Sequence, residues 1–197
     1  MNDWEKIISD LNTHHWRPEK TRTAVLCVDC QEYFRGLCAP ILTNITRVIE
    51  ASHRAKVPLF FTQHGHPPNE DPGLLGDWWA DIIIEGSEGS ELLPELHVRP
   101  GDTLIKKDRY SAFYKTDLER LMCKKGIKDL VVGGVMTNLC CETTARDAFV
   151  RDYRVFFLAD GTATANTEFH LATLKNLSYG FATLMTCDQL ISHLIEI

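Results

Sequence analysis

This sequence contains no apolar run that approaches the roughly 20 residues needed for a membrane-spanning helix. Its first residues, Met-Asn-Asp-Trp-Glu-Lys, lack the basic and then apolar layout of a signal peptide. Internal repeats, low-complexity segments and Ser/Gly-rich linkers are also missing. We therefore expect a cytoplasmic protein with no membrane partner.

Positive charge is scarce in this chain. Lys and Arg number 21 against 27 Asp and Glu, which gives a net charge of −6 at pH 7, and the basic residues form no cluster that could follow a phosphate backbone. A nucleic-acid partner is therefore not expected. The 197 residues are 44% hydrophobic and 24% charged, which is typical of a globular protein. We expect one domain that spans residues 1–197 and has a full core.

The cysteines form no regular disulfide framework, and their number, seven, is odd. In a reducing compartment we expect them to be free thiols. Cys27 and Cys30 form a C-x-x-C motif, but it lies within and just past a predicted strand rather than at a helix start. This position argues against a redox role for the pair.

A strand, a glycine turn and a helix follow one another around Cys140. Residues 130–132 are apolar and predict a buried strand, and the glycine pair 133–134 allows a tight turn after it. A helix then begins, with Thr137 or Asn138 as its cap. Cys140 is therefore expected in the first turn of a helix that follows a strand.

A cysteine at that position has two interpretations. The free amides and positive dipole end of a helix favour a thiolate, and they can stabilise an oxyanion formed when that thiolate attacks a carbonyl. The alternative is a buried structural cysteine, which is the common fate of a free thiol. The local pattern leaves both open.

The rest of the chain alternates strand-like and helix-like segments. Strands are predicted at residues 23–28, 58–62, 103–107, 130–132, 154–158 and 181–185. Helices are predicted at residues 2–11, 41–56, 116–125 and 166–179, after Cys140, and from Asp188 onward. This alternation indicates βαβ units. We therefore predict an α/β fold, a three-layer α/β/α sandwich with a six-stranded, mostly parallel sheet.

Three chemically useful side chains lie at the ends of predicted strands. Asp29 follows the first strand, Lys107 ends the third, and Cys140 follows the fourth. Taken singly, Asp29 could form a turn and Lys107 could be a solvated charge. In a parallel sheet, however, all three strand ends open on one edge, where ligands bind. The sequence therefore predicts that a carboxylate, an ammonium and a thiol meet there.

Residues 63–79 form a long loop after the second strand, and loops of this length are usually functional. His64 and His66 make an H-x-H pair, a spacing that occurs in metal sites, but no further ligand completes a set nearby. The alternative is that one imidazole lines a pocket. Trp78 and Trp79 are expected to divide between the core and a pocket rim or subunit contact.

With these residues in view, the sequence resembles the isochorismatase-like cysteine hydrolases, which include nicotinamidases, N-carbamoylsarcosine amidases and ureidoacrylate amidohydrolases. The resemblance runs from about Thr23 to Leu190. It rests on Asp29-Cys30-Gln31 with Phe34, on Lys107 with Tyr110-Ser111-Ala112-Phe113, and on residues 134–148, which read Gly-Val-Met-Thr-Asn-Leu-Cys and then Thr-Ala-Arg-Asp-Ala. It implies an isochorismatase-like, Rossmann-like fold.

The resemblance also implies roles for single residues. Asp29 corresponds to the general base, Lys107 to its charged partner and Cys140 to the nucleophile. The family has a cis peptide bond between the positions of Val135 and Met136, and the amides of Met136 and Cys140 would form the oxyanion hole.

Two details of the resemblance narrow the chemistry. True isochorismatases carry glycine at the position of Cys140, so this cysteine implies hydrolysis of an amide C–N bond through a thioester. The neighbouring Cys141 is expected to be packed in the interior. Metal-binding nicotinamidases carry Asp-x-His and a further histidine, whereas His64 stands at the aspartate position here and only His66 matches. No metal and no cofactor are therefore expected.

The expected substrate is a small, flat or partly apolar amide, and family members are commonly homo-oligomers, either dimers or tetramers. The substrate pocket is predicted to draw on Phe34, His64, Trp78, Trp79, Tyr110 and Phe113. Two alternatives stay open: hydrolysis of a non-amide bond such as a vinyl ether or an ester, and a non-catalytic thiol redox sensor.

Overall fold

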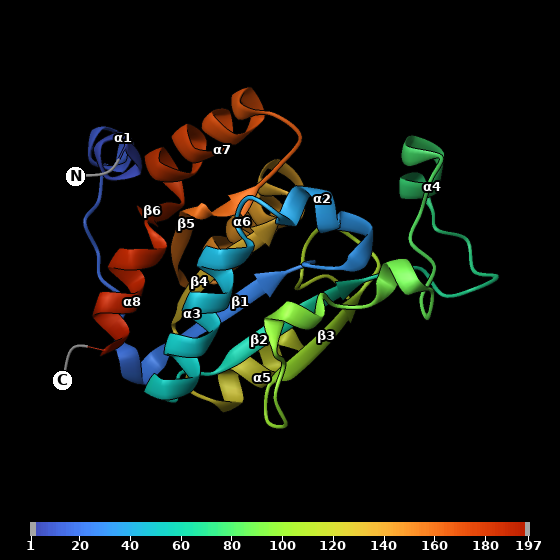
Figure 1. The fold of residues 1–197 in the computed structure, drawn as a ribbon, viewed down its shortest axis with the longest axis horizontal. Helices are drawn as coiled ribbons and strands as arrows, with labels where there is room; N and C mark the ends of the chain where they lie inside the picture. The colour runs from blue at the N-terminus through green and yellow to red at the C-terminus, as the bar shows by residue number, and fades with distance from the viewer. Residues whose placement is uncertain (1–2, 196–197) are drawn as a thin grey trace.

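Six strands form one sheet at the centre of the structure, a computed structural model that describes residues 3–195 (Figure 1). The strand order is β3-β2-β1-β4-β5-β6, and every neighbouring pair is parallel. The strands are β1 (Thr23–Val28), β2 (Leu59–His64), β3 (Thr103–Lys107), β4 (Asp129–Val135), β5 (Arg154–Ala163) and β6 (Ala182–Met185). The predicted α/β fold is confirmed, and the sheet expected to be mostly parallel is parallel throughout.

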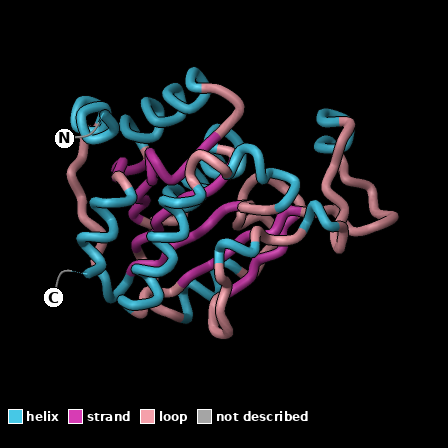
Figure 2. Tube along the Cα trace, in the orientation of Figure 1, coloured by secondary structure: helices cyan, strands magenta, loops and turns pink. Residues whose placement is uncertain are grey.

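Helices cover both faces of the sheet, as Figure 2 shows. One face packs against α1 (Asp3–Leu11), α5 (Leu118–Lys124), α6 (Glu142–Val150) and α7 (Thr167–Gly180). The other face packs against α2 (Arg35–Cys38), α3 (Leu42–Ala55) and α8 (Cys187–Ile195). Apolar residues at helical spacing, such as Ile45, Val48 and Ile49 of α3, build these two cores. Within the described residues, no helix combines the length and apolarity of a membrane span.

Several elements differ in extent from the predicted ones. β2 continues to His64 and β5 to Ala163, because parallel pairing with β3 and β4 extends both strands beyond their apolar runs. The first predicted helix was expected to start at Asn2, which lies outside the described residues, and α1 is described from Asp3.

The centre of the sheet is the place where the strand order reverses direction. β1 lies between β2 and β4, so the chain leaves β1 toward one side of the sheet and returns through β4 on the other. The two strands approach closely at Gly134, where an added Cβ atom would lie 2.1 Å from the carbonyl oxygen of Val28. Gly134 also has φ +112°, so glycine is required there on both counts.

The segment between β2 and β3 projects from the body of the molecule and carries a short helix, α4 (Leu74–Trp79), at the right of Figure 1. The loop predicted at residues 63–79 thus contains a helix. We call residues 67–82 the arm. Its helix exposes Leu74 (83%) and Trp78 (78%), an unusual display of large apolar side chains.

A side chain pairs with one residue of the sheet edge formed by β6. The Asn12 amide nitrogen donates to the carbonyl oxygen of Leu184 at 3.0 Å, and the Leu184 amide donates to the Asn12 side-chain oxygen at 2.8 Å. Asn12 therefore pairs with the strand as a neighbouring backbone would.

Candidate active site

Asp29 follows β1 directly and is completely buried. Its backbone has φ +50°, in the left-handed region that few residues other than glycine adopt and that aspartate tolerates better than most. This conformation ends the strand and directs the side chain toward the place where the strand order of the sheet reverses direction. Thr62 on β2 donates its hydroxyl proton to Asp29 Oδ1 at 2.6 Å.

Lys107 is the last residue of β3, two strands away from β1 in the sheet. Its side chain has no exposed surface, and its Nζ donates to the carbonyl oxygen of Arg109 at 3.0 Å. The following residues are held against α6, because the Ala112 amide donates to the Thr144 hydroxyl at 3.0 Å. This connection brings the end of β3 next to the segment that carries Cys140.

Cys140 lies in a short π-helical segment, Thr137–Cys141, that leads from β4 into α6. The expectation that Thr137 or Asn138 caps a helix here is wrong. The Thr137 hydroxyl is paired with His170 Nδ1 at 3.0 Å, and the Asn138 side-chain oxygen accepts from Thr164 at 2.5 Å. Both side chains therefore make long-range contacts in place of a cap.

The structure brings the three predicted residues into contact. Lys107 Nζ lies 2.7 Å from Asp29 Oδ2 and 3.4 Å from Cys140 Sγ. Lys107 Nζ therefore bridges the Asp29 carboxylate and the Cys140 sulfur. A carboxylate, an ammonium and a thiol from three strand ends thus share one buried site.

Asp29 and Lys107 form a buried ion pair in this site. Burial has the largest single effect on the pKa of Asp29 and would raise it, but the Lys107 charge, a smaller contribution from His64 and the hydrogen bonds from Lys107 and Thr62 together hold the pKa below its ordinary value. Burial would likewise lower the pKa of Lys107, but Asp29 and Cys140 raise it. At neutral pH Asp29 is therefore a carboxylate and Lys107 an ammonium.

Cys140 is a thiol, not a thiolate, in this arrangement. Burial raises its pKa to about 12, against the opposing effect of the Lys107 charge. A helix start was expected to favour the thiolate, but burial has the larger effect on the Cys140 pKa. The thiol therefore needs a base to become a nucleophile.

The peptide bond between Val135 and Met136 is cis. The Met136 carbonyl oxygen accepts from the amides of Leu139 and Cys141, at 3.1 and 3.2 Å. These hydrogen bonds connect the end of β4 to the π-helical segment, so they fix the position of Met136 relative to the segment that contains Cys140.

A cavity of about 380 Å³ opens onto the Cys140 sulfur. Among the predicted substrate-binding residues, Phe34, His64, Trp79 and Tyr110 line it, together with Met136. The remaining lining residues are Tyr33, Leu37, His66, Leu75, Asp81, Ile82, Ile83 and Leu139. Most of the lining residues are apolar or aromatic and a few are polar, as is usual for a small-molecule pocket.

Two of the predicted pocket residues do not line this cavity. Trp78 is 78% exposed and points away, because its neighbour Trp79 takes the inward side of α4 and donates from Nε1 to the Tyr110 hydroxyl at 2.7 Å. Phe113 is buried in the core, where its ring lies 5.9 Å from that of Tyr153 and under the Arg151 guanidinium.

The two histidines of the H-x-H pair lie side by side, with ring centroids 5.2 Å apart. Burial and the nearby Lys107 charge lower the pKa of His64 to about 4, and burial and Arg109 lower that of His66, so both are neutral at pH 7. His64 Nδ1 and His66 Nε2 are buried and have no hydrogen-bond partner among the described residues.

Gln31 and Thr62 support the site, although no role was predicted for either of them. Buried Gln31 accepts from the His64 amide at 2.8 Å and donates to the carbonyl oxygens of His64 and Ser90. Thr62 holds Asp29 as described above. Gln31 belongs to the Asp29-Cys30-Gln31 motif but has no predicted role, and Thr62 carries no local signal because threonine is common within strands.

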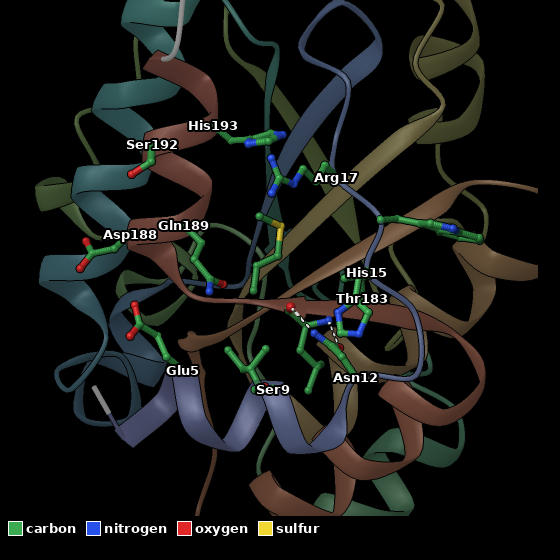
Figure 3. A pocket seen from close by; sticks show the side chains of 14 residues that line it. Glu5, Ser9, Asn12, His15, Arg17, Thr183, Asp188, Gln189, Ser192 and His193 are labelled. Atoms are coloured by element: carbon green, nitrogen blue, oxygen red, sulfur yellow. Dashed lines mark hydrogen bonds between the residues drawn. The ribbon is translucent and has the colours of Figure 1, made fainter. Parts of the chain in front are cut away.

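A larger cavity, about 500 Å³, lies between α1, α8 and β6 and contains none of the three residues (Figure 3). The dashed lines in Figure 3 at Asn12 are its hydrogen bonds to the edge strand. Of these two cavities, only the smaller one is lined by Cys140, whose sulfur contacts Lys107.

The protonation state of Cys140 predicts its reactivity. We expect iodoacetamide to modify Cys140 slowly at pH 7, with a rate that rises about tenfold per pH unit through pH 9, because only the thiolate reacts and the pKa is about 12. Peptide mapping by mass spectrometry separates this thiol from exposed Cys123, which serves as the internal control. A rate that levels off near pH 7 would show instead a stable thiolate beside Lys107.

Known proteins resemble this chain in sequence. The family model of the isochorismatase domain matches residues 23–189. Nicotinamidase 3 of Arabidopsis thaliana is 47% identical over 176 residues, covering 88% of this chain and 89% of that protein. A ureidoacrylate amidohydrolase of Pseudomonas savastanoi is 29% identical over 212 residues, covering 89% of this chain and 86% of that protein.

A solved structure shares the whole architecture. The crystal structure of a cysteine hydrolase from Pseudomonas syringae superposes with a TM-score of 0.88 at 25% identity, covering 91% of this chain and 95% of that one.

Proposed function

The chain belongs to the isochorismatase family, and from this we propose that it is a cysteine-dependent hydrolase that cleaves the C–N bond of a small-molecule amide through a thioester. The observation that carries the proposal is the contact of one buried ammonium, Lys107 Nζ, with both the Asp29 carboxylate and the Cys140 sulfur. The amide-hydrolysing relatives support the same bond type.

In the proposed first step, the Asp29 carboxylate takes the proton of the Cys140 thiol. The Asp29 carboxylate is ionised and shares the Lys107 ammonium with that thiol, and Lys107 compensates the negative charge as it moves to sulfur. The high pKa of the resting thiol makes this transfer necessary. Deprotonation and attack on the amide carbonyl are therefore expected to occur together, once substrate is bound.

The attack forms a C–S bond and places negative charge on the former carbonyl oxygen. The backbone amides of Met136 and Cys140 are proposed to hold that oxyanion. Asp29 then gives its proton to the leaving nitrogen, the C–N bond breaks, and the amine departs. Water, deprotonated by Asp29, cleaves the thioester, which yields the carboxylic acid and restores the thiol.

The cavity supports a small, flat substrate. About 380 Å³ of space is bounded by aromatic side chains such as Phe34 and Trp79. The neutral imidazoles of His64 and His66 each hold a nitrogen without a partner among the described residues, and these nitrogens are available to hydrogen-bond polar substrate atoms. Nicotinamide, the compound indicated by the name of the 47% identical relative, is therefore the first amide to test.

The metal ion of some nicotinamidases does not fit these residues. His64 and His66 supply two nitrogens, and no group of three or more His, Cys, Asp or Glu side chains within residues 3–195 could hold a metal ion. No step of the proposed mechanism uses a metal.

Ammonia release from a panel of nicotinamide, carbamoyl and ureido compounds tests the function directly. We expect turnover of at least one primary amide, with the same rate before and after dialysis against EDTA, because Asp29, Lys107 and Cys140 supply the chemistry. Loss of activity in EDTA with recovery on adding Zn²⁺ would contradict the metal-free mechanism.

The same panel separates the alternatives. Turnover of an ester or a vinyl ether without any amide turnover would indicate the non-amide reaction. No turnover, together with a reversible disulfide in thiol titrations, would indicate the redox sensor.

A further inference from the structure

Thr62 lies at the point where β2 passes beside the end of β1, and its side chain is completely buried. Its neighbours in the strand, Phe60 and Phe61, are core residues. A hydroxyl in such surroundings needs hydrogen-bond partners. Both of its partners belong to one residue, Asp29.

The two hydrogen bonds fix the direction of the hydroxyl proton. The Asp29 backbone amide donates to Thr62 Oγ1 at 3.0 Å, so that oxygen acts as an acceptor there. The single hydroxyl proton is then left for Asp29 Oδ1, to which it donates at 2.6 Å. One side chain thus ties the backbone and the carboxylate of Asp29 to β2.

The carboxylate is consequently held from two sides. Thr62 occupies Oδ1 and Lys107 occupies Oδ2, at 2.6 and 2.7 Å. These partners come from β2 and β3, the two strands on the same side of β1. Rotation of the carboxylate about its Cβ–Cγ bond would break both contacts, so its plane relative to the Cys140 sulfur is fixed.

We propose that Thr62 is a positioning residue for the general base, which holds the Asp29 carboxylate in the orientation that accepts the Cys140 proton. This inference rests on the proposed function. Thr62 does not reach the cavity and acts only through Asp29. Its hydroxyl also stabilises the ionised carboxylate, as a charge-assisted hydrogen bond does.

The test compares Thr62→Val, which keeps the shape and removes the hydroxyl, with Thr62→Ser, which keeps the hydroxyl. Thr183→Val on β6 is the matched control: Thr183 is also a buried strand threonine, but its hydroxyl has no partner among the described residues and lies beside the cavity of Figure 3. All three variants and the wild type are assayed for amide turnover from about pH 2.5 to pH 9, because the pKa of Asp29 lies below its ordinary value.

We expect Thr62→Val to lower kcat by about 10- to 100-fold, the range for losing a hydrogen bond to a charged group. The acid limb of its pH profile should move up by about one pH unit, because an Asp29 carboxylate without this hydrogen bond protonates at higher pH. Thr62→Ser should restore both quantities to near the wild-type values, and Thr183→Val should change neither.

A second readout does not depend on turnover. The Asp29 carboxyl carbon, assigned by comparison with Asp29→Asn, is titrated by ¹³C NMR in the wild type and in both valine variants. The midpoint should rise in Thr62→Val alone. An unchanged midpoint and an unchanged acid limb would overturn the inference, even if Thr62→Val is less stable. A raised midpoint in a protein that hydrolyses no amide would retain the positioning role and reject the proposed function.

Discussion

Replacing Cys140 with alanine should abolish amide turnover, with a loss in kcat of about 10⁴-fold or more, because no other group can form the covalent intermediate. The neighbouring variant, Cys141→Ala, should keep kcat within the same order of magnitude. Cys140 touches Lys107 and lines the cavity, whereas Cys141 is completely buried in the core. Initial rates of ammonia release measure both variants.

The two cysteines form a matched pair, since both belong to the same π-helical segment and each variant removes one sulfur atom. Far-UV circular dichroism shows whether each variant is folded. If the Cys141→Ala enzyme is folded but inactive while the Cys140→Ala enzyme is active, then the nucleophile is Cys141 and not Cys140.

Replacing Lys107 with methionine should remove activity and also cost about 3–5 kcal/mol of unfolding free energy. The reason is that Asp29 has no exposed surface and would be left as a buried carboxylate without its cation. Urea denaturation at pH 7 measures the free energy of unfolding. The change is expected to be much larger than for a surface lysine, because exposed ion pairs contribute little.

The double variant Asp29→Asn with Lys107→Met separates the two effects. With the carboxylate neutral, the uncompensated charge disappears, so most of the lost stability should return while the enzyme stays inactive. If the double variant is as unstable as Lys107→Met alone, then packing of the lysine side chain, and not its charge, is what stabilises the site.

The framework of the site could be predicted from sequence because it follows from short-range patterns. The apolar run 130–132 and the alternation of strands with helices were enough to define a parallel sheet, although the turn predicted at residues 133–134 is wrong because β4 continues through them to Val135. In such a sheet the carboxyl ends of the strands share one edge, so Asp29, Lys107 and Cys140 had to come near each other. The 3.4 Å contact of Lys107 with Cys140 is the result.

The pocket walls could not be predicted in this way, because they depend on contacts between distant residues. Trp78 and Trp79 are adjacent and equally aromatic, and only the hydrogen bond of Trp79 to Tyr110, 31 residues away, decides which one faces the cavity. Phe113 belongs to the family motif, yet it packs on Tyr153 and Arg151.

The electrostatics of the site also required the structure. The position of Cys140 after a strand suggested a stabilised thiolate, but the balance between burial and the Lys107 charge depends on solvent exposure, which sequence does not contain. The role of Thr62 was hidden for the same reason, since threonine is common in strands and only its contacts with Asp29 distinguish it.

The pairing of Asn12 with Leu184 bears on how copies of this protein can aggregate. A sheet edge with free amide and carbonyl groups is a template onto which a strand of another molecule can add, and such addition begins amyloid-like stacking. Here both backbone groups of Leu184 are already occupied by an amide side chain of the same chain. An incoming strand would first have to displace Asn12, so strand addition at this edge is blocked at Leu184.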